Sequence, residues 1–149
     1  LFIRRMTELT GVQPLASGAP LQGGAAVPPG VVVYDINGPL FFGAAREALD
    51  QVVMLDREVR VVVLEMGDVS IIDMTGIVAL QSALARLHRH GVAVVVAGLG
   101  RQVHAKLHRA GLVEQPGRLE FADSASAALA RAGELAAVAA PAAGVSSAP

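Results

Sequence analysis

Cysteine and tryptophan are absent from this chain of 149 residues, and the other aromatic residues are few, with one tyrosine and four phenylalanines. The lack of cysteine excludes disulfide bonds, thiolate metal ligands and a cysteine nucleophile. The scarcity of aromatic side chains argues against a surface on which nucleic-acid bases stack. Because the formal net charge is only −1, no overall positive field attracts nucleic acid either. We therefore expect no nucleic-acid partner.

Long apolar runs are also lacking, although 53% of the residues are hydrophobic. Glycine, proline or a charged residue interrupts every apolar stretch before it reaches the roughly 18 residues that a membrane-spanning helix needs. The apolar content is nevertheless too high for a wholly disordered chain. At this length we expect one folded domain with short additional segments.

Composition divides the chain into four zones. Residues 1–10 begin apolar and become basic, and residues 11–30 are rich in glycine, proline, alanine and serine, which is typical of a flexible linker. Residues 31–133 carry the periodic patterns of a folded domain. Residues 134–149 form an Ala/Pro/Ser-rich tail that gains little free energy by ordering, so we predict that this tail is disordered.

Strand and helix patterns alternate within the folded zone. β-Branched runs predict strands, and apolar residues at helical spacing predict helices, two of which end at glycines. The expected strands are 31–34, a short 39–42, 60–64, 92–97 and 119–121; the expected helices are 43–58, 73–90, 101–110 and 123–132, with Asp73 and Asp123 as N-caps. Such alternation requires parallel crossovers. The sequence therefore predicts an α/β fold with a central, mostly parallel sheet of four to five strands and about four helices.

The segment Leu64–Gly76, LEMGDVSIIDMTG, joins a central strand to the start of a helix. In open α/β sheets, ligands bind at this carboxyl end of the strands. Asp73 can cap the helix, and Thr75 would lie in its first turn, where a hydroxyl faces a partner and an added phosphate is electrostatically tolerated. We also expect Ile71 and Ile72 to anchor the loop in the core. From these residues alone, a simple helix cap is the favoured interpretation.

The same segment resembles the signature of the STAS domain, which is shared by the C-termini of sulfate transporters and by anti-sigma-factor antagonists. That signature is a strand, an acidic residue, a Val-x-x-x-Asp step and a Ser/Thr–Gly pair that opens a helix. Here Glu65 is followed by Val69 and then by Asp73–Met74–Thr75–Gly76. The resemblance extends over residues 31–133 and includes GPLFFGAA at 38–45. It implies a small STAS-like fold.

The resemblance is strongest to the C-terminal cytoplasmic domain of SulP-family anion transporters. Antagonist proteins of the family carry Asp-Ser-Ser-Gly and are phosphorylated on the serine before the glycine, which is the place of Thr75 here. Met74 replaces the other serine and Glu65 replaces the more usual aspartate, and both departures favour the transporter branch. The resemblance thus implies a regulatory and interaction domain of a sulfate or bicarbonate transporter. A free-standing anti-sigma-factor antagonist, switched by phosphorylation at Thr75, is the alternative.

The predicted site follows from this resemblance, with Thr75 as the candidate phosphorylation site. The predicted partner-binding loop consists of Asp68, Ser70, Asp73, Met74, Thr75 and Gly76. No catalytic residue is predicted, because no GxSxG elbow surrounds Ser70 and no base can be named for Ser70 or Thr75 from spacing. We therefore expect a binding domain and not an enzyme.

The first ten residues also favour the transporter interpretation. LFI followed by Arg4 and Arg5 is typical of the cytoplasmic end of a transmembrane helix, and the alternative is a soluble first turn with two surface arginines. A chain that opens on Leu1 is expected to be part of a longer protein. The resemblance then implies a location on the cytoplasmic side of the cell's inner membrane. The implied partners are the transmembrane domain of the same chain, a second copy in a full-length homodimer, and a cytosolic regulatory protein.

Two weaker patterns carry less specific predictions. The GLG sequence at 98–100 follows a strand, but the third glycine of a dinucleotide-binding loop would fall at Val103, so a compact turn is the simpler interpretation. The residues kept as a candidate nucleotide or anion site are Gly98, Gly100 and Arg101. His104 and His108 are spaced like metal ligands, but no third ligand accompanies them. We therefore predict no metal and no other cofactor.

Charge is distributed unevenly along the folded zone. Residues 31–75 carry a net charge of −5, whereas residues 76–111 carry +5 and contain no acidic residue. One hypothesis is that the two parts pair with each other within the fold. The other hypothesis is that helices 76–90 and 101–110 present a basic face to anionic lipid, to an acidic protein surface or to a nucleotide.

Overall fold

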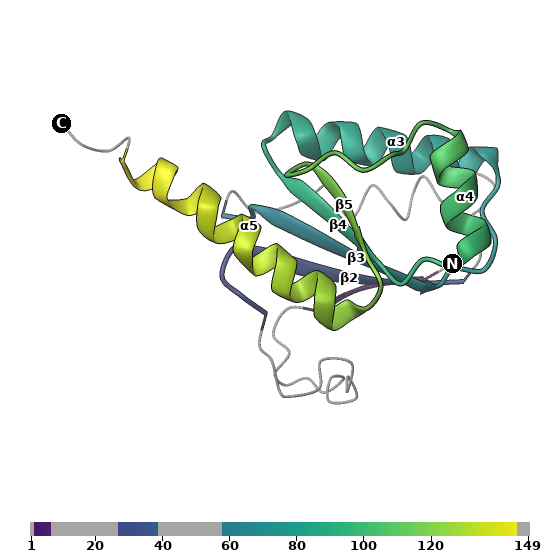
Figure 1. The fold of residues 1–149 in the computed structure, drawn as a ribbon, viewed down its shortest axis with the longest axis horizontal. Coiled ribbons are helices and arrows are strands. Elements are labelled where there is room, and N and C mark those ends of the chain that lie inside the picture. Colours follow the sequence, from purple (N-terminus) through teal and green to yellow (C-terminus); the bar gives the residue numbers. More distant parts are fainter. Residues whose placement is uncertain (1, 7–26, 39–57, 146–149) are drawn as a thin grey trace.

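The described residues of the computed structural model are 2–6, 27–38 and 58–145, and they form an α/β fold (Figure 1). The elements in chain order are β1 (Phe2–Met6), β2 (Val31–Asn37), β3 (Val61–Asp68), α3 (Met74–Arg89), β4 (Ala93–Ala97), α4 (Arg101–Arg109), β5 (Leu119–Ala122) and α5 (Ala125–Val145). The predicted fold class is confirmed, with three helices among the described residues. The expected strand 39–42 and nearly all of the expected helix 43–58 lie outside them.

The strands form one sheet in the order β1-β2-β3-β4-β5. Strands β2 to β5 are parallel, as predicted, and β1 is antiparallel to β2. Residues 1–10 were predicted to be the end of a transmembrane helix, but Phe2–Met6 is instead an edge strand. The physical reason is that β2 offers a row of backbone donors and acceptors that a neighbouring strand satisfies. Among the described residues, no helix has both the length and the apolar character to cross a membrane.

Helices cover both faces of the sheet, with α3 and α4 on one side and α5 on the other (Figure 1). Alternate residues of each strand point to opposite faces, so Val62 and Leu64 pack with the α3 and α4 residues, whereas Val61 and Val63 pack with α5. All four are at most 1% exposed. The prediction that 60–64 is a central strand with no wet face is therefore confirmed.

Glycines end the helices on the α3–α4 side where the sequence predicted. Gly91 follows α3 with φ of +74°, and Gly111 follows α4 with φ of +92°. Glycine occupies this left-handed conformation without the clash that a Cβ would cause. These turns return the chain to β4 and, through the loop at 111–118, to β5.

Helix α5 differs from its prediction at both ends. Its N-cap is Ser124 and not Asp123, because the Ser124 hydroxyl accepts a hydrogen bond from Ala127 N–H at 3.1 Å. The helix runs to Val145, so residues 134–145 are helical where a disordered tail was predicted. Alanine has the highest helix propensity, and buried Ala136 packs on the sheet beyond the expected end at Ala132.

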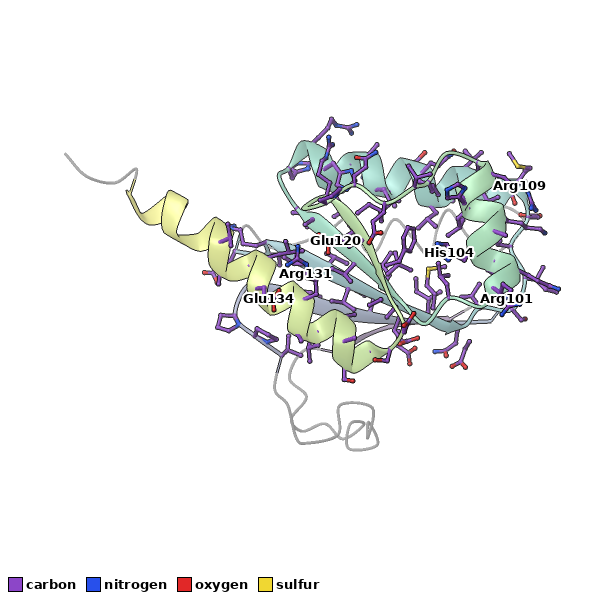
Figure 2. The ribbon with its side chains drawn as sticks, viewed as in Figure 1. Arg101, His104, Arg109, Glu120, Arg131 and Glu134 are labelled. Atoms are coloured by element: carbon purple, nitrogen blue, oxygen red, sulfur yellow. The ribbon has the colours of Figure 1, made fainter. Side chains whose placement is uncertain are left out.

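An ion pair also fixes α5 to the sheet. Arg131 of α5 contacts both carboxylate oxygens of Glu120 in β5, with Nε–Oε1 at 2.7 Å and Nη2–Oε2 at 3.1 Å, and it also reaches Glu134 (Figure 2). The Arg131 hydrogen bond lowers the pKa of Glu120, and a Gly117 N–H adds to this effect. The paired Glu120 is only 9% exposed.

Candidate functional site

The loop between β3 and α3 lies at the carboxyl end of the central strand. Val69 is 2% exposed and Ile72 is fully buried, so these two side chains hold the loop against the core. A hydrogen bond from Val69 N–H to Met66 O at 3.0 Å closes the turn that follows the strand. The prediction that Ile72 anchors the loop is confirmed. The same prediction for Ile71 is wrong, because Ile71 is 54% exposed.

Asp73 caps α3, as the sequence predicted. Its Oδ1 accepts hydrogen bonds from Gly76 N–H at 3.0 Å and from the Thr75 hydroxyl at 2.6 Å. This satisfies one of the backbone donors that a helix leaves unpaired at its start. Thr75 is exposed, so its hydroxyl is held in one orientation on the surface of the first helical turn.

Most of the predicted partner-binding loop is accessible. Asp68, Ser70, Met74 and Thr75 are exposed, Asp73 is half-buried and Gly76 is buried. Met74 is 64% exposed and Val78 is 50% exposed, and their i, i+4 spacing places them on one face of α3. Large exposed apolar side chains beside a polar loop are typical of a protein contact surface. Val78 directly follows Ile77, which faces the core. Because adjacent residues of a helix point in different directions, the exposure of Val78 could have been predicted from the helical spacing of the core residues.

A hollow of about 370 Å³ lies beside this loop, between the start of α3 and the last turns of α4. We call it the α3–α4 hollow, and it is lined by Ile72, Asp73, Met74, Ile77, Lys106, Arg109 and Ala110. Lys106 Nζ donates a hydrogen bond to Ile72 O at 3.1 Å, which ties α4 to the loop. Asp73 and Met74 were predicted to belong to the site, whereas Lys106 and Arg109 were not. Their side chains reach the site from a helix that follows later in the chain.

A second hollow, of about 450 Å³, lies at the other end of α3 against the loop at 111–118. It is lined by Gln81, Leu84, Ala85, His88, Arg89, Gly111, Leu112, Val113, Gln115, Arg118 and Leu119. A hydrogen bond between His88 Nε2 and Arg118 O at 2.9 Å joins its two walls. None of the residues of the predicted partner-binding loop lines it.

Glu65 lies in the second half of β3, between Asp35 of β2 and Ala97 of β4. Burial raises the pKa of its carboxyl above the ordinary value of 4.5, and the carboxylates of Asp35 and Asp68 raise it further. A hydrogen bond from Gly67 N–H to Oε1 at 2.6 Å acts in the opposite direction. Glu65 Oε1 lies so close to Gly98 that a Cβ there would stand 2.8 Å from it.

The predicted turn at 98–100 is present. Gly98 has φ of +76°, and its N–H already donates to Ala122 O at 3.0 Å. Gly100 is the N-cap of α4, and Arg101 is exposed at its start. Because the carboxylate of Glu65 lies against Gly98, this turn is electrostatically unfavourable for an anion, so the candidate nucleotide or anion site stays a prediction without geometric support.

His104 and His108 are both exposed on α4. The His104 ring lies 4.7 Å from the Phe121 ring, between centroids, and Figure 2 places His104 on the inner side of α4. Within the described part of the chain, no three His, Cys, Asp or Glu residues are grouped in a way that could hold a metal ion.

Comparison with known proteins gives consistent matches. A family model for the STAS domain matches residues 25–128. The candidate sulfate transporter YvdB of Bacillus subtilis (strain 168) is 30% identical over 124 residues, which are 82% of this chain and 23% of that protein. The chain thus spans about a quarter of the length of this curated relative.

Two solved structures have the same fold over most of their length. A sulfate transporter family protein from Wolinella succinogenes superposes with a TM-score of 0.68 at 32% identity, covering 78% of this chain and 96% of the other. The STAS domain of a SulP transporter from Vibrio cholerae superposes with a TM-score of 0.63 at 27% identity, covering 80% and 94%.

Proposed function

Because the chain belongs to the STAS domain family and its homologues are STAS domains of SulP sulfate transporters, we propose that it is the regulatory and interaction domain of an inorganic anion transporter. It acts on the cytoplasmic side of the cell membrane, and the carried anion is sulfate or bicarbonate. The observation that carries this proposal is the exposure of Met74 and Thr75 at the start of α3, directly after the loop that follows β3.

Contacts at this loop would be well defined in space. Val69 and Ile72 are anchored in the core, and Asp73 fixes the first turn of the helix. A rigid scaffold below exposed apolar side chains limits the conformational entropy lost on docking. The partners are the transmembrane domain of the same transporter, a second copy in the full-length homodimer, and a cytosolic regulatory protein. The domain contributes contacts and no catalytic step.

Phosphorylation of Thr75 supplies a means of regulation. A phosphate adds a charge of about −1.5 to −2, and the start of a helix tolerates negative charge. The added charge and its hydration would sit next to Met74, on the surface that docks a partner. Phosphorylated and unmodified domains would therefore bind that partner with different affinities.

The test uses the full-length parent transporter and its anion uptake. Met74→Asp places a charge on the proposed contact surface, so uptake is expected to change severalfold at an unchanged level of protein in the membrane. Val138→Asp is the matched control, because Val138 is 76% exposed on α5, on the other side of the sheet. Equal uptake by both variants and the natural protein would overturn the proposal.

The exposed hydroxyl of Thr75, directly before Gly76, also supports a second candidate function, that of an anti-sigma-factor antagonist switched by phosphorylation. Incubation with the cognate kinase and ATP, followed by mass spectrometry, separates the two functions. Stoichiometric phosphate on Thr75 that is absent from Thr75→Val, together with release of a bound regulatory protein, would favour the antagonist. Lack of transfer would eliminate it.

A further inference from the structure

The surface around the α3–α4 hollow is cationic. Residues 76–111, which include most of α3 and all of α4, contain five Lys and Arg residues and no Asp or Glu. Two of the five, Lys106 and Arg109, line the hollow. Arg101 lies at the opposite end of α4 from Arg109 (Figure 2), so among the described residues the positive charge at the hollow comes from Lys106 and Arg109.

The hollow combines this charge with an apolar interior. Ile72 is fully buried, Ile77 is 4% exposed, and the partly buried Ala110 packs against the core cluster to which both belong. Met74 stands at the edge with 64% of its surface exposed. An occupant that covers Met74 and fills this space removes apolar surface from water on both partners, which is favourable.

Lys106 and Arg109, at the edge of the hollow, have N–H groups available to donate hydrogen bonds to a partner. Lys106 uses one of its three ammonium protons for Ile72 O, and the part of the chain that the structure describes provides no ion pair for Arg109. The acid that lines the hollow, Asp73, is engaged by Gly76 N–H and the Thr75 hydroxyl. Lys106 and Arg109 are therefore placed to meet carboxylates of an incoming partner.

We propose that the α3–α4 hollow binds an acidic, amphipathic segment of a partner protein. One apolar side chain of that segment enters the hollow beside Met74 and Ile77, and its flanking carboxylates pair with Lys106 and Arg109. The inference rests on the proposed docking function and adds the second wall of the site, α4, and the chemistry of the partner.

Charge and shape together select a protein segment as the occupant. A nucleotide base is bound best by stacking on aromatic rings, and none of the described residues that line the hollow is aromatic. A lipid headgroup needs only positive charge, which leaves the apolar interior and the exposed Met74 without a role. An apolar side chain flanked by acids matches the whole lining.

The test measures fluorescence anisotropy of labelled peptides with the full 149-residue chain. The probe is a short peptide with a central leucine flanked by glutamates. One control replaces the leucine with glutamine, and the other replaces the glutamates with lysines. Only the first peptide is expected to bind, and its affinity should fall as salt rises from roughly 50 to 300 mM, because screening weakens exposed charge pairs.

Two charge-reversal variants locate the binding. Arg109→Glu is expected to weaken the acidic peptide at least about fivefold. Arg118→Glu carries the same charge change in the second hollow and should leave binding unchanged. Both arginines are exposed, and circular dichroism checks that both variants stay folded. Amide NMR shifts on peptide addition should concentrate at Met74, Ile77 and Ala110.

Other outcomes overturn the inference. Absence of binding at about 1 mM peptide removes the assigned partner chemistry, and equal loss in both arginine variants shows non-specific attraction. If anionic lipid vesicles or ATP displace the peptide, the occupant of the hollow is a lipid or a nucleotide. If self-association of the chain blocks peptide binding, the occupant is a second copy of the chain. The transport assay is independent of the peptide assay. If the peptide binds but Met74→Asp leaves anion uptake unaltered, the proposed function is contradicted and the peptide site is not.

Discussion

Gly98 is required by its surroundings as well as by its backbone. Its φ of +76° favours glycine, and a Cβ there would stand 2.8 Å from Glu65 Oε1 and 3.3 Å from Gly67 N and Cα. The Glu65 oxygen cannot withdraw freely, because it accepts the hydrogen bond from Gly67 N–H. The end of β3 and the turn after β4 thus pack against each other, with Gly67 of the strand in contact with Gly98 of the turn.

The prediction compares Gly98→Ala with Gly91→Ala. Both residues have positive φ, but a Cβ at Gly91 would meet nothing within 4 Å. We expect Gly91→Ala to lower the free energy of unfolding by about 1 kcal/mol, from backbone strain. Gly98→Ala should cost about 1 kcal/mol or more beyond that, because crowding adds to the strain. Urea denaturation measures both, and equal costs would contradict the close approach.

Glu65 makes the stability of the domain depend on pH. Because its pKa is raised in the folded state, the folded protein binds the proton more tightly than the unfolded chain. The associated stability is complete below the ordinary value of 4.5 and is lost as pH rises through the higher folded-state pKa. Glu65→Gln removes this loss, so its free energy of unfolding should rise relative to the natural protein between about pH 4 and pH 7.

Glu120 is the control for this prediction, since its shift has the opposite sign. Arg131 lowers the pKa of Glu120, so this contribution is present above the ordinary value and is lost as pH falls. Glu120→Gln should therefore destabilise the protein most near neutral pH. Urea denaturation across the pH range checks both variants, and a pH-independent difference for Glu65→Gln would show that its carboxyl titrates normally.

At the scale of the element, helix α5 packs closely against the sheet because the residues that face the sheet are small. Ala128 and Ala132 are fully buried against the valines of β2, β3 and β4. Ala132→Leu inserts volume at a close contact and is expected to lower the free energy of unfolding by about 1–3 kcal/mol. The exposed Ala127 provides the control, because Ala127→Leu should change it by less than about 0.5 kcal/mol. Thermal denaturation would compare them, and equal melting temperatures would contradict the packing.

The strands and helix ends that the sequence predicted correctly are those set by local physics. The valine runs at 31–34 and 60–64, the cap at Asp73 and the glycine at 91 each depend on a few adjacent residues. Apart from the N-cap of α5, which lies one residue later than predicted, the errors in the fold concern partners distant in the chain. Phe2–Met6 became a strand through β2, and α5 extends past residue 132 because its alanines face the sheet.

In the candidate site, too, features set by adjacent residues were predicted, and features set by distant residues were not. The capping role of Asp73 followed from its position in the sequence, the loop residues followed from the family resemblance, and the exposure of Thr75 agrees with the predicted contact surface. The surface position of Ile71 did not follow, because two adjacent isoleucines have the same local pattern whichever of them turns inward. Lys106 was not foreseen because its hydrogen bond to Ile72 O joins residues 34 positions apart.

At the scale of the whole molecule, the sheet has a protected centre and two edges. Strand β3 has neighbours on both sides and helices over both faces, whereas β1 and β5 are edge strands. We expect the amides of Val62, Val63 and Leu64 to exchange hydrogen only through global unfolding, and those of β1 and β5 to exchange faster through local opening. Native-state hydrogen exchange with NMR detection tests this, and uniform protection across all five strands would contradict it.

The direction of β1 determines where the chain enters the domain. Phe2 pairs with Asn37, and Asn37 pairs with Asp68. The first residue of β1 and the start of the docking loop therefore both lie at the carboxyl end of the parallel strands. A protein body joined ahead of Phe2 would be tethered within reach of that loop, at an effective concentration that reaches the millimolar range for short connections. A contact too weak to detect between separate molecules would then be formed most of the time within the tethered protein.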